Sequence, residues 1–263
     1  MNPRDIYLLN PKEFSPEVIA VAFAKTSRSP ESFREITIGL TDEKSAEFNE
    51  KWVVGYGHAS VAEHAVLHLA VENISRLAIE SLESNRLASY TEKSTRYQVF
   101  DRDAFYTPAV IASSKYAQLF SDTIHLLYDT YFDSIDPVRA VIRQKYPRMA
   151  DESEKKYEGR IRSKWIDNCR FMLPMATLAN VGMTANARVL EHTLTKMLSH
   201  PLDEVREIGL EMRAVARAEV PTLLKYADAS EYLAREYKNA EANSQNGQSN
   251  NESVKLIDFD REA

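Results

Sequence analysis

Residues 84–97 combine the side chains that proteins use to bind phosphate. The segment reads SNRLASYTEKSTRY and places Arg86 and Arg96 among serine and threonine hydroxyls. A guanidinium group presents a planar fork of donors that matches phosphate oxygens, and hydroxyls add neutral donors beside it. Clusters of this composition also cap helices and face water in many proteins. Composition alone therefore indicates a candidate phosphate site without establishing one.

A second polar segment, residues 57–64, reads GHASVAEH. Its two histidines and one carboxylate suggest metal ligands, but His58 and His64 lie six positions apart, and a metal site needs ligands in a fixed local geometry. Ser60 and Glu63 also have the spacing of a helix capping box, in which hydroxyl and carboxylate bind backbone amides reciprocally. We favour the capping interpretation over the metal site on the residues alone.

A third pair of segments, residues 170–174 and 184–188, reads RFMLP and TANAR. Asn186 precedes apolar residues at helical spacing and is a plausible cap for a helix that begins at Ala187. The simplest interpretation of Arg188 is a surface residue on that amphipathic helix.

The elements expected around these segments mix helices with a strand. The spacing predicts a helix over 16–26, opened by Ser15 and Pro16, and a second helix over about 43–54. Alternating apolar residues predict a strand over 64–72, and helical spacing returns from Ile74 to Leu82. Residues 84–97 are therefore predicted to be a loop that leaves a helix following a strand.

The second half of the chain is predicted to be mainly helical. A long helical region over 110–135 and 138–144 is expected to be divided at Asp136 and Pro137, because proline disfavours helical geometry at the residue before it. The charged run 151–160 is typical of a solvated helix face. Further helices are predicted from Ala187 to Met197 and over 202–215.

Length and composition set limits on the class of protein. A chain of 263 residues with 44% hydrophobic residues can bury a sizeable core in one large domain or two small ones. The net charge of −6 argues against polymeric nucleic acid and acidic membranes as partners, because both need a basic face, but permits a local basic pocket for one nucleotide. The single cysteine, Cys169, excludes an intrachain disulfide framework and is expected to be buried and inert. No apolar stretch is long enough to span a bilayer, so we expect a soluble cytoplasmic protein.

The chain divides by composition into one domain, a linker and a tail. Residues 1–238 carry the apolar patterns, whereas 239–253 lack large apolar side chains and are predicted to be a flexible linker. Residues 254–263 begin with a strand-like alternation that resembles residues 6–13, IYLLNPKE. Two interpretations stay open: the tail begins a second copy of the domain, or it is a short strand that adds to a sheet edge.

Together, these segments resemble the sequence motifs of the flavin-dependent thymidylate synthases, in the expected order over most of residues 1–226. The family signature is usually written Arg-His-Arg-x-x-Ser, followed five residues on by Ser-x-Arg-Tyr, and Arg86, Ser89, Ser94, Arg96 and Tyr97 fit it. Residues 57–64 resemble the family motif His-x-Ser/Thr-x-x-Glu-His. Residues 170–174 and 184–188 resemble its Arg-x-x-Leu-Pro and Asn-x-Arg elements.

The resemblance implies a fold, a reaction and an assembly. The fold would be α+β, with a central, mostly antiparallel sheet flanked by long helices. The reaction would be reductive methylation of dUMP to dTMP, with methylenetetrahydrofolate giving the carbon and NADPH-reduced FAD giving hydride. No catalytic cysteine and no metal would then be required. The active sites would lie between the subunits of a homotetramer.

The resemblance also implies roles for individual residues. Cofactor-binding positions would be Ser60, Glu63, Asn85, Arg86, Leu87, Asn186, Arg188 and His192. Substrate-binding positions, for dUMP or a related pyrimidine nucleotide, would be Ser81, Ser84, Glu92, Ser94, Thr95, Arg96 and Arg170. Asn186 and Arg188 would act at a helix amino terminus, where free amides favour anions.

Four positions depart from the family pattern. Ser81 replaces a glutamine, Ser84 an arginine, Asn85 a histidine and Met197 an arginine, which leaves Lys196 as the nearby cation. Removal of one charge-assisted phosphate bond costs about 1.5–3 kcal/mol. Besides the synthase, two alternatives therefore stay open: a homologue that acts on another nucleotide, and a non-catalytic homologue that pairs with an active copy.

Overall fold

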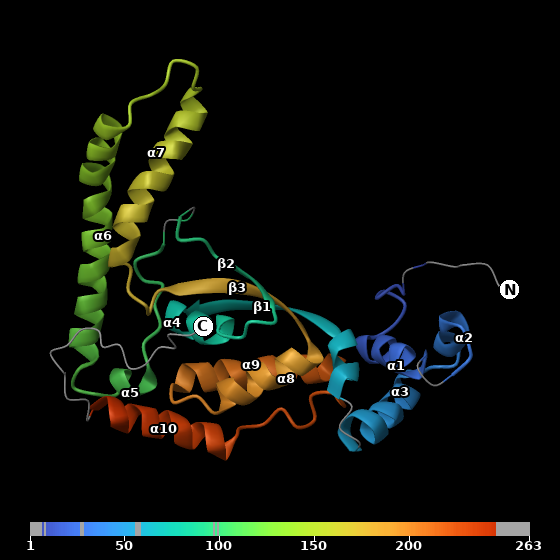
Figure 1. Ribbon diagram of the computed structural model, residues 1–263. Helices are drawn as coiled ribbons and strands as arrows, with labels where there is room; N and C mark the ends of the chain where they lie inside the picture. Colours follow the sequence, from blue (N-terminus) through green and yellow to red (C-terminus); the bar gives the residue numbers. More distant parts are fainter. Residues whose placement is uncertain are drawn as a thin grey trace, which may run out of the picture.

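The computed structural model describes residues 7, 9–26, 29–55, 59–96, 98 and 100–245. Its centre is one three-stranded antiparallel sheet with the strand order β1-β3-β2 (Figure 1). β1 spans Val66–Ser75, β2 spans Ser89–Glu92 and β3 spans Leu178–Asn186. Because β3 is the middle strand, a segment from the second half of the chain joins two strands from the first half.

Alternating side chains give the sheet a buried face and an open face. Leu67 and Leu69 of β1 are buried, whereas His68 and Ala70, which follow them in turn, are exposed. β3 follows the same period of two; its buried residues are Ala179, Val181, Met183 and Ala185. The prediction of a strand with one buried face from residue 64 is confirmed, but the strand starts at Val66 and continues to Ser75.

A register shift between Val71 and Ile74 ends the regular pairing of β1 with β3. Asn73 lies inside it at a φ of 58°, a left-handed conformation that asparagine tolerates better than most residues. Its amide donates to Asn180 Oδ1 at 3.0 Å. The irregularity turns the chain into α4 (Arg76–Glu83), so Ile74 belongs to the strand and not to the helix predicted from that residue.

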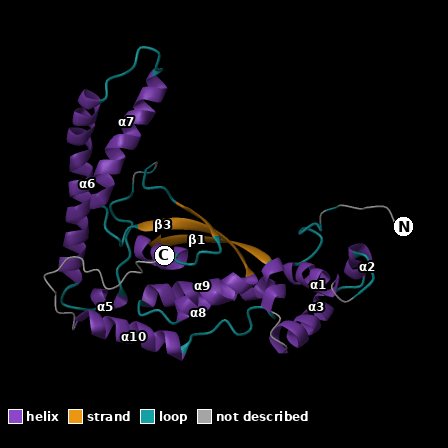
Figure 2. Ribbon diagram, viewed as in Figure 1, coloured by secondary structure: helices purple, strands orange, loops and turns teal. Residues whose placement is uncertain are grey.

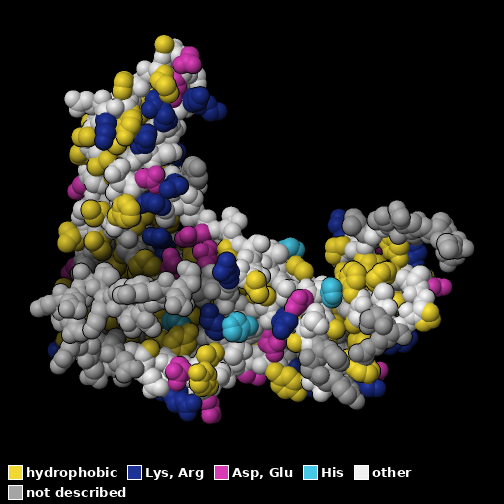
Figure 3. Space-filling view, in the orientation of Figure 1, with side chains coloured by type: hydrophobic (Ala, Val, Ile, Leu, Met, Phe, Trp, Pro, Cys, Tyr) yellow, Lys and Arg dark blue, Asp and Glu magenta, His cyan; other side chains and the backbone are white. Residues whose placement is uncertain are grey.

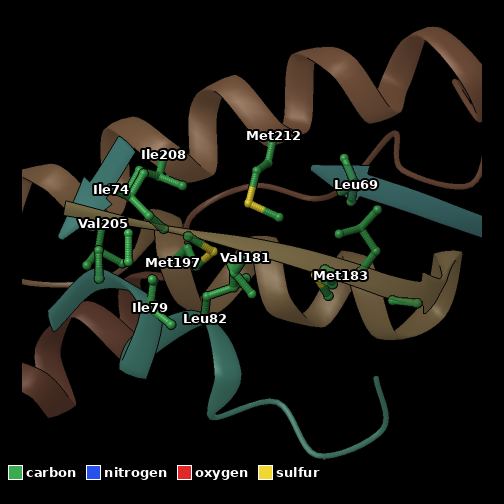
Figure 4. Close-up of a cluster of buried hydrophobic side chains, with 14 of the residues drawn as sticks. Leu69, Ile74, Ile79, Leu82, Val181, Met183, Met197, Val205, Ile208 and Met212 are labelled. Atoms are coloured by element: carbon green, nitrogen blue, oxygen red, sulfur yellow. The ribbon is translucent and has the colours of Figure 1, made fainter. Parts of the chain in front are cut away.

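Three helices cover the buried face of the sheet: α4, α8 (Ala187–Leu198) and α9 (Asp203–Glu219). Figure 4 shows their apolar side chains pointing toward Val181 and Met183 of β3. Ser75 joins the layers, because its hydroxyl caps α4 and also donates to the buried Glu204 of α9 at 2.6 Å. The elements that border the loop after α4 are therefore anchored in one core.

A helical pair, α6 (Ala117–Lys145) and α7 (Glu154–Cys169), extends away from the sheet (Figures 1 and 2). The predicted division at Pro137 is wrong, because α6 continues through it. Pro137 is exposed, while Tyr131, Ile135 and Val138 pack on the core, so packing on both sides offsets the hydrogen bond that proline removes. The break falls earlier, between the short α5 (Ala109–Ala112) and α6.

The amino-terminal helices form a smaller apolar cluster at the other end of the sheet (Figure 1). They are α1 (Pro16–Thr26), α2 (Phe33–Ile38) and α3 (Asp42–Asn49). α3 continues into a π-helical segment, Glu50–Gly55, and a 3₁₀ segment, Ala59–His64, leads into β1. The buried Glu17 of α1 accepts from the amides of Thr222 and Leu223, which fixes this unit to the chain after α9.

These elements confirm the predicted α+β class with an antiparallel sheet and long helices. Two strands were missed: β3, and β2, which lies inside the segment predicted to be a loop. α10 spans Glu231–Gln245, so the predicted linker 239–253 begins as helix. The rest of that linker and the tail 254–263 lie outside the described residues.

Cys169 is buried, as predicted. None of the helices described is both long and apolar enough to cross a membrane.

Candidate functional site

A pocket of about 760 Å³ lies between the 3₁₀ segment before β1, the loop after α4 and one face of α8; we call it the α8 pocket. Its volume is within the range of about 300–1,000 Å³ common for small-molecule sites. Seven of the eight predicted cofactor-binding residues line it; Ser60 does not. The lining residues are Glu63, Ser84, Asn85, Arg86, Leu87, Asn186, Arg188, Val189, His192 and Lys196.

The cap and period of α8 explain why these side chains meet. Asn186 ends β3 and caps the helix, its Oδ1 accepting from the Val189 amide at 2.9 Å, as the sequence predicted. Arg188, His192 and Lys196 follow at intervals of four, and residues four apart share a helix face. Met197, one position further, is buried in the core under the sheet. The pocket cation on this turn of α8 is therefore Lys196, and position 197 faces away.

The charges of the α8 pocket are unevenly balanced. Arg188 forms an ion pair with Glu63, which joins α8 to the segment before β1. Within the described part of the chain, no carboxylate forms an ion pair with Arg86 or Lys196. The pocket also contains the start of α8, whose backbone amides favour anions. An arrangement of this kind suits a ligand that carries phosphate.

Asn85 is a structural residue of the loop as well as part of the pocket. It is buried, and its Nδ2 donates to the Leu82 carbonyl at 2.9 Å. The Tyr90 hydroxyl donates to the Leu82 and Asn85 carbonyls at 3.1 and 3.0 Å. Asn85 Oδ1 accepts from Lys196 Nζ at 3.4 Å. Asn85 therefore holds the turn that carries Ser84 and Arg86.

Burial changes the titration of two carboxyl groups on the helices that border the pocket. Loss of solvent raises the pKa of Glu191 on α8, and the nearby positive charges of Arg188 and His192 oppose that rise. Burial is also the main cause that raises the pKa of Glu83 at the end of α4, with Glu92 and Glu80 adding repulsion. Both groups hold a proton more tightly than a carboxyl in water.

Three of the predicted substrate-binding residues form a separate group, which we call the arginine cluster: Thr95, Arg96 and Arg170 together with Asp167. Arg96 Nε donates to Asp167 Oδ1 at 2.8 Å, and Arg170 Nε lies 3.4 Å from the same oxygen. Arg170 Nη1 donates to the Thr95 hydroxyl at 3.2 Å. The cluster joins the loop after β2 to the end of α7, and none of its members lines the α8 pocket.

The other predicted substrate-binding residues are dispersed. Ser84 lines the α8 pocket, whereas the Ser81 hydroxyl faces its own helix and donates to the Leu77 carbonyl at 3.4 Å. Glu92 lies 3.7 Å from Arg76, and the Ser94 hydroxyl accepts from the Arg96 amide. One chain thus gathers the predicted cofactor residues but not the predicted nucleotide residues.

The 57–64 segment divides its polar groups between different neighbours. Glu63 pairs with Arg188, and the His64 ring stacks on Phe23 with centroids 4.8 Å apart. His58 lies outside the described residues. Among the residues that the structure describes, no group of three His, Cys, Asp or Glu side chains is placed to hold a metal ion.

The predicted site omitted Lys196 and Val189 of the α8 pocket and Asp167 of the arginine cluster. The interval of four from Arg188 through His192 to Lys196 is a signal in the sequence that could have placed Lys196 on the pocket face. Asp167 gives no such signal, because its partners Arg96 and Arg170 meet it only through folding of distant segments.

Fold and pocket together define an α+β protein with a pocket, rich in positive charge, between the loop after α4 and the amino-terminal part of α8. Residues 11–222 match the family model described as thymidylate synthase complementing protein. The chain belongs to this family, which confirms the resemblance found in the sequence.

Curated relatives agree with this assignment, and a solved structure shares the fold. A UPF0159 protein of Chlamydia pneumoniae is 33% identical over 71% of this chain and 36% of its own length, so the chain spans little more than a third of that relative. A flavin-dependent thymidylate synthase of Clostridium tetani is 28% identical over 82% of this chain and 84% of its own length. The UMP/dUMP methylase PolB of Streptomyces cacaoi, bound with 5-Br dUMP, has the same fold, with a TM-score of 0.56 at 18% identity over 80% of this chain and 89% of that chain.

Proposed function

We propose that this chain is an FAD-dependent thymidylate synthase-like protein that methylates dUMP reductively to dTMP, with methylenetetrahydrofolate and NADPH as co-substrates. The observation that carries the proposal is the α8 pocket, where seven of eight residues expected to bind flavin line one cavity. Family membership and the flavin-dependent relatives support it.

The residues present fit a flavin nucleotide. Arg86, Arg188 and Lys196 offer charged donors, and Asn186 places the start of α8 at the pocket wall. Leu87 is largely exposed beside them and offers an apolar surface for a flat ring. Bound FAD would supply the hydride chemistry of the reaction, as cofactors do in such enzymes. Arg86 and Lys196 would hold its phosphates, and Arg188 would exchange its pairing with Glu63 for a contact to the cofactor.

The arginine cluster is proposed to bind the nucleotide. Arg96 and Arg170 share the single carboxylate of Asp167, so the cluster has more positive than negative charge available to a phosphate. Because this cluster lies outside the α8 pocket of the same chain, the proposal includes a homotetramer in which the pocket of one subunit meets the cluster of another. The assembly follows from the family resemblance and is part of the proposal.

A second candidate is a non-catalytic family member that pairs with an active copy. One observation favours keeping it: two of the positions that depart from the family pattern serve the fold itself, since the Ser81 hydroxyl donates to the Leu77 carbonyl and Met197 is buried in the core. A homologue that acts on another pyrimidine nucleotide is the remaining alternative.

The test is the visible spectrum of the purified protein with added FAD, followed by anaerobic NADPH reduction with and without dUMP. A flavin spectrum, dUMP-dependent reduction and dTMP formation on adding methylenetetrahydrofolate are the expected results. Flavin binding without any response to dUMP would favour another nucleotide. Absence of flavin binding at any attainable concentration would leave the non-catalytic homologue.

A further inference from the structure

We propose that Lys196 supplies the phosphate-binding charge that the loop lacks at Ser84, so that this pocket binds the phosphates of a flavin nucleotide through Lys196 of α8 together with Arg86 of the loop. The inference rests on the proposed flavin site and names the residue on which the affinity for phosphate depends. It assigns a function to a departure from the family pattern.

The position of the Lys196 ammonium group allows it to replace a cation at residue 84. Lys196 Nζ donates to Ser84 Oγ at 3.0 Å and to Asn85 Oδ1 at 3.4 Å. These are the two positions at which the sequence lacks the cationic head of the family signature. The positive charge of Lys196 therefore lies beside residues 84 and 85, although Lys196 is more than a hundred positions away in the sequence.

The hydrogen-bond inventory leaves Lys196 one donor for a ligand. Ser84 Oγ donates its own proton to the Ser81 carbonyl at 2.8 Å, so toward Lys196 it acts as an acceptor. An ammonium group carries three N–H donors, and two of them are used on Ser84 and Asn85. Both partners are neutral, so they orient the ammonium group without neutralising it.

The balance of charge favours Lys196 over Arg188 as the main phosphate ligand of the pocket. Arg188 is already paired with Glu63, whereas no carboxylate of the described residues forms an ion pair with Lys196. Lys196 is also partly buried, and a charge removed from water interacts more strongly with an anion than an exposed one. Each phosphate group of the FAD pyrophosphate carries a negative charge, and its oxygens accept charge-assisted hydrogen bonds from such an ammonium group.

The geometry further implies that cations at positions 84 and 196 exclude each other. An arginine at 84 would bring a second positive charge into the surroundings of Lys196 Nζ, because the side chain of residue 84 contacts this ammonium group in the wild type, with Ser84 Oγ at 3.0 Å. Like charges that are close together repel. The small hydroxyl at 84 is therefore the partner that a lysine at 196 requires.

A double-mutant cycle tests the inference by flavin fluorescence, with the Kd of FAD and of riboflavin as readouts. Riboflavin lacks the phosphates and the adenosine of FAD, and it reports contacts to the isoalloxazine ring and the ribityl chain. Lys196→Met should weaken FAD binding about tenfold or more, as loss of a charge-assisted bond does, and leave riboflavin unchanged. Lys155→Met, which removes an exposed lysine of α7 outside the pocket, is the matched control and should change neither Kd.

The second arm of the cycle places the cation on the loop again. Ser84→Arg alone should not improve FAD binding, because the new charge meets Lys196. Ser84→Arg combined with Lys196→Met should recover most of the affinity that Lys196→Met loses, giving a coupling between the two positions that distant sites do not show. Lys196→Arg should keep FAD affinity within about threefold of the wild type, because it keeps the charge while changing the donor geometry.

Two results would overturn the inference while leaving the flavin site in place. One is FAD binding by Lys196→Met with the wild-type Kd. The other is an equal loss for FAD and riboflavin, which indicates a change in pocket shape and no phosphate contact. Absence of FAD binding by the wild-type chain would overturn both the proposed function and this inference. Circular dichroism melting curves identify any variant that fails to fold.

Discussion

At the scale of single residues, the α8 pocket is defined by which of its charges are already paired. Arg188 and Glu63 form an ion pair with both side chains about half exposed, at 52% and 49%. Exposed pairs of this kind contribute only about 0–1 kcal/mol to stability. The pair matters more for binding, because Arg188 can leave Glu63 and contact a ligand that enters the pocket.

Arg188→Ala should therefore affect binding and stability differently. We expect the Kd for FAD to rise about tenfold, while the free energy of unfolding changes by less than about 1 kcal/mol. Flavin fluorescence and urea unfolding measure the two quantities. Arg143→Ala is the matched control, because Arg143 pairs with Glu158 at similar exposure, 48% and 44%, but lies outside the pocket. Equal FAD affinity in both variants would contradict a binding role for Arg188.

Glu191 provides a prediction about pH. Burial raises its pKa in the folded protein above the unfolded value, so the folded state holds the proton more tightly. Stability from this group is present below the unfolded pKa and is lost as pH rises through the folded value. Glu191→Gln should therefore make the protein more stable than the wild type at pH 7, with the difference shrinking toward pH 4.

Urea unfolding of both proteins at several pH values between 4 and 7 measures this effect. Because the wild type and the variant share all other groups, their difference isolates Glu191. A difference that is constant across this range would show that the carboxyl does not titrate there.

At the scale of elements, the contact of α8 with α9 sets the orientation of the pocket face. Gly209 lies where the two helices approach closely, and a Cβ added there would stand 3.0 Å from Met197 Cβ. Met197 directs its side chain into this contact, while its neighbour Lys196 faces the pocket. The packing of Met197 against α9 on one side of α8 therefore positions the charge of Lys196 on the pocket side.

Gly209→Ala should destabilise the protein by about 1–3 kcal/mol, as overpacking does, and weaken FAD binding through displacement of α8. Gly159→Ala on α7 is the matched control, because a Cβ there meets nothing within 4 Å. That variant should be more stable than the wild type by about 0.5–1 kcal/mol, since alanine is the better helix former. Chemical denaturation of both variants measures the change in the free energy of unfolding. Equal changes in the two variants would contradict the close contact between α8 and α9.

At the scale of the whole molecule, the two candidate binding regions stand apart. Figure 3 shows charged and histidine side chains over the middle of the molecule, between the α6–α7 pair and the amino-terminal helices. The α8 pocket and the arginine cluster share no residue, and they are built from different elements. The proposed homotetramer, in which the pocket of one subunit meets the arginine cluster of another, would bring the two regions together.

Mixing two defective chains tests this arrangement. A chain with Arg170→Ala keeps the pocket, and a chain with Arg188→Ala keeps the arginine cluster. If sites form between subunits, random mixing should restore about a quarter of the wild-type sites for dUMP-dependent flavin reduction. The FAD concentration is kept well below the Kd of the Arg188→Ala variant, so that each variant alone should show little dUMP-dependent reduction. A mixture no better than its parts would contradict a site shared between chains.

Sequence patterns predicted the local features of the site well. Asn186 as the cap of α8 is confirmed, because a cap depends on hydrogen bonds within one turn. The buried face of β1 is confirmed for the same kind of reason, since its signal is alternation along one strand. β3 was not predicted: its buried residues Ala179, Val181, Met183 and Ala185 alternate, but alanine and glycine, which occupy three of its nine positions, are depleted in strands and weaken the signal.

The sequence by itself determined the family, the fold class and the chemical types available at the site. These depend on residue identity and on spacing within single elements, where backbone hydrogen bonds and side-chain period act locally. Only the tertiary structure decided that Lys196 meets Ser84, and that Arg96 and Arg170 share Asp167 apart from the pocket. α6 likewise continues through Pro137 because the core holds it on both sides. Such outcomes depend on contacts between segments far apart in the chain, and no local pattern encodes them.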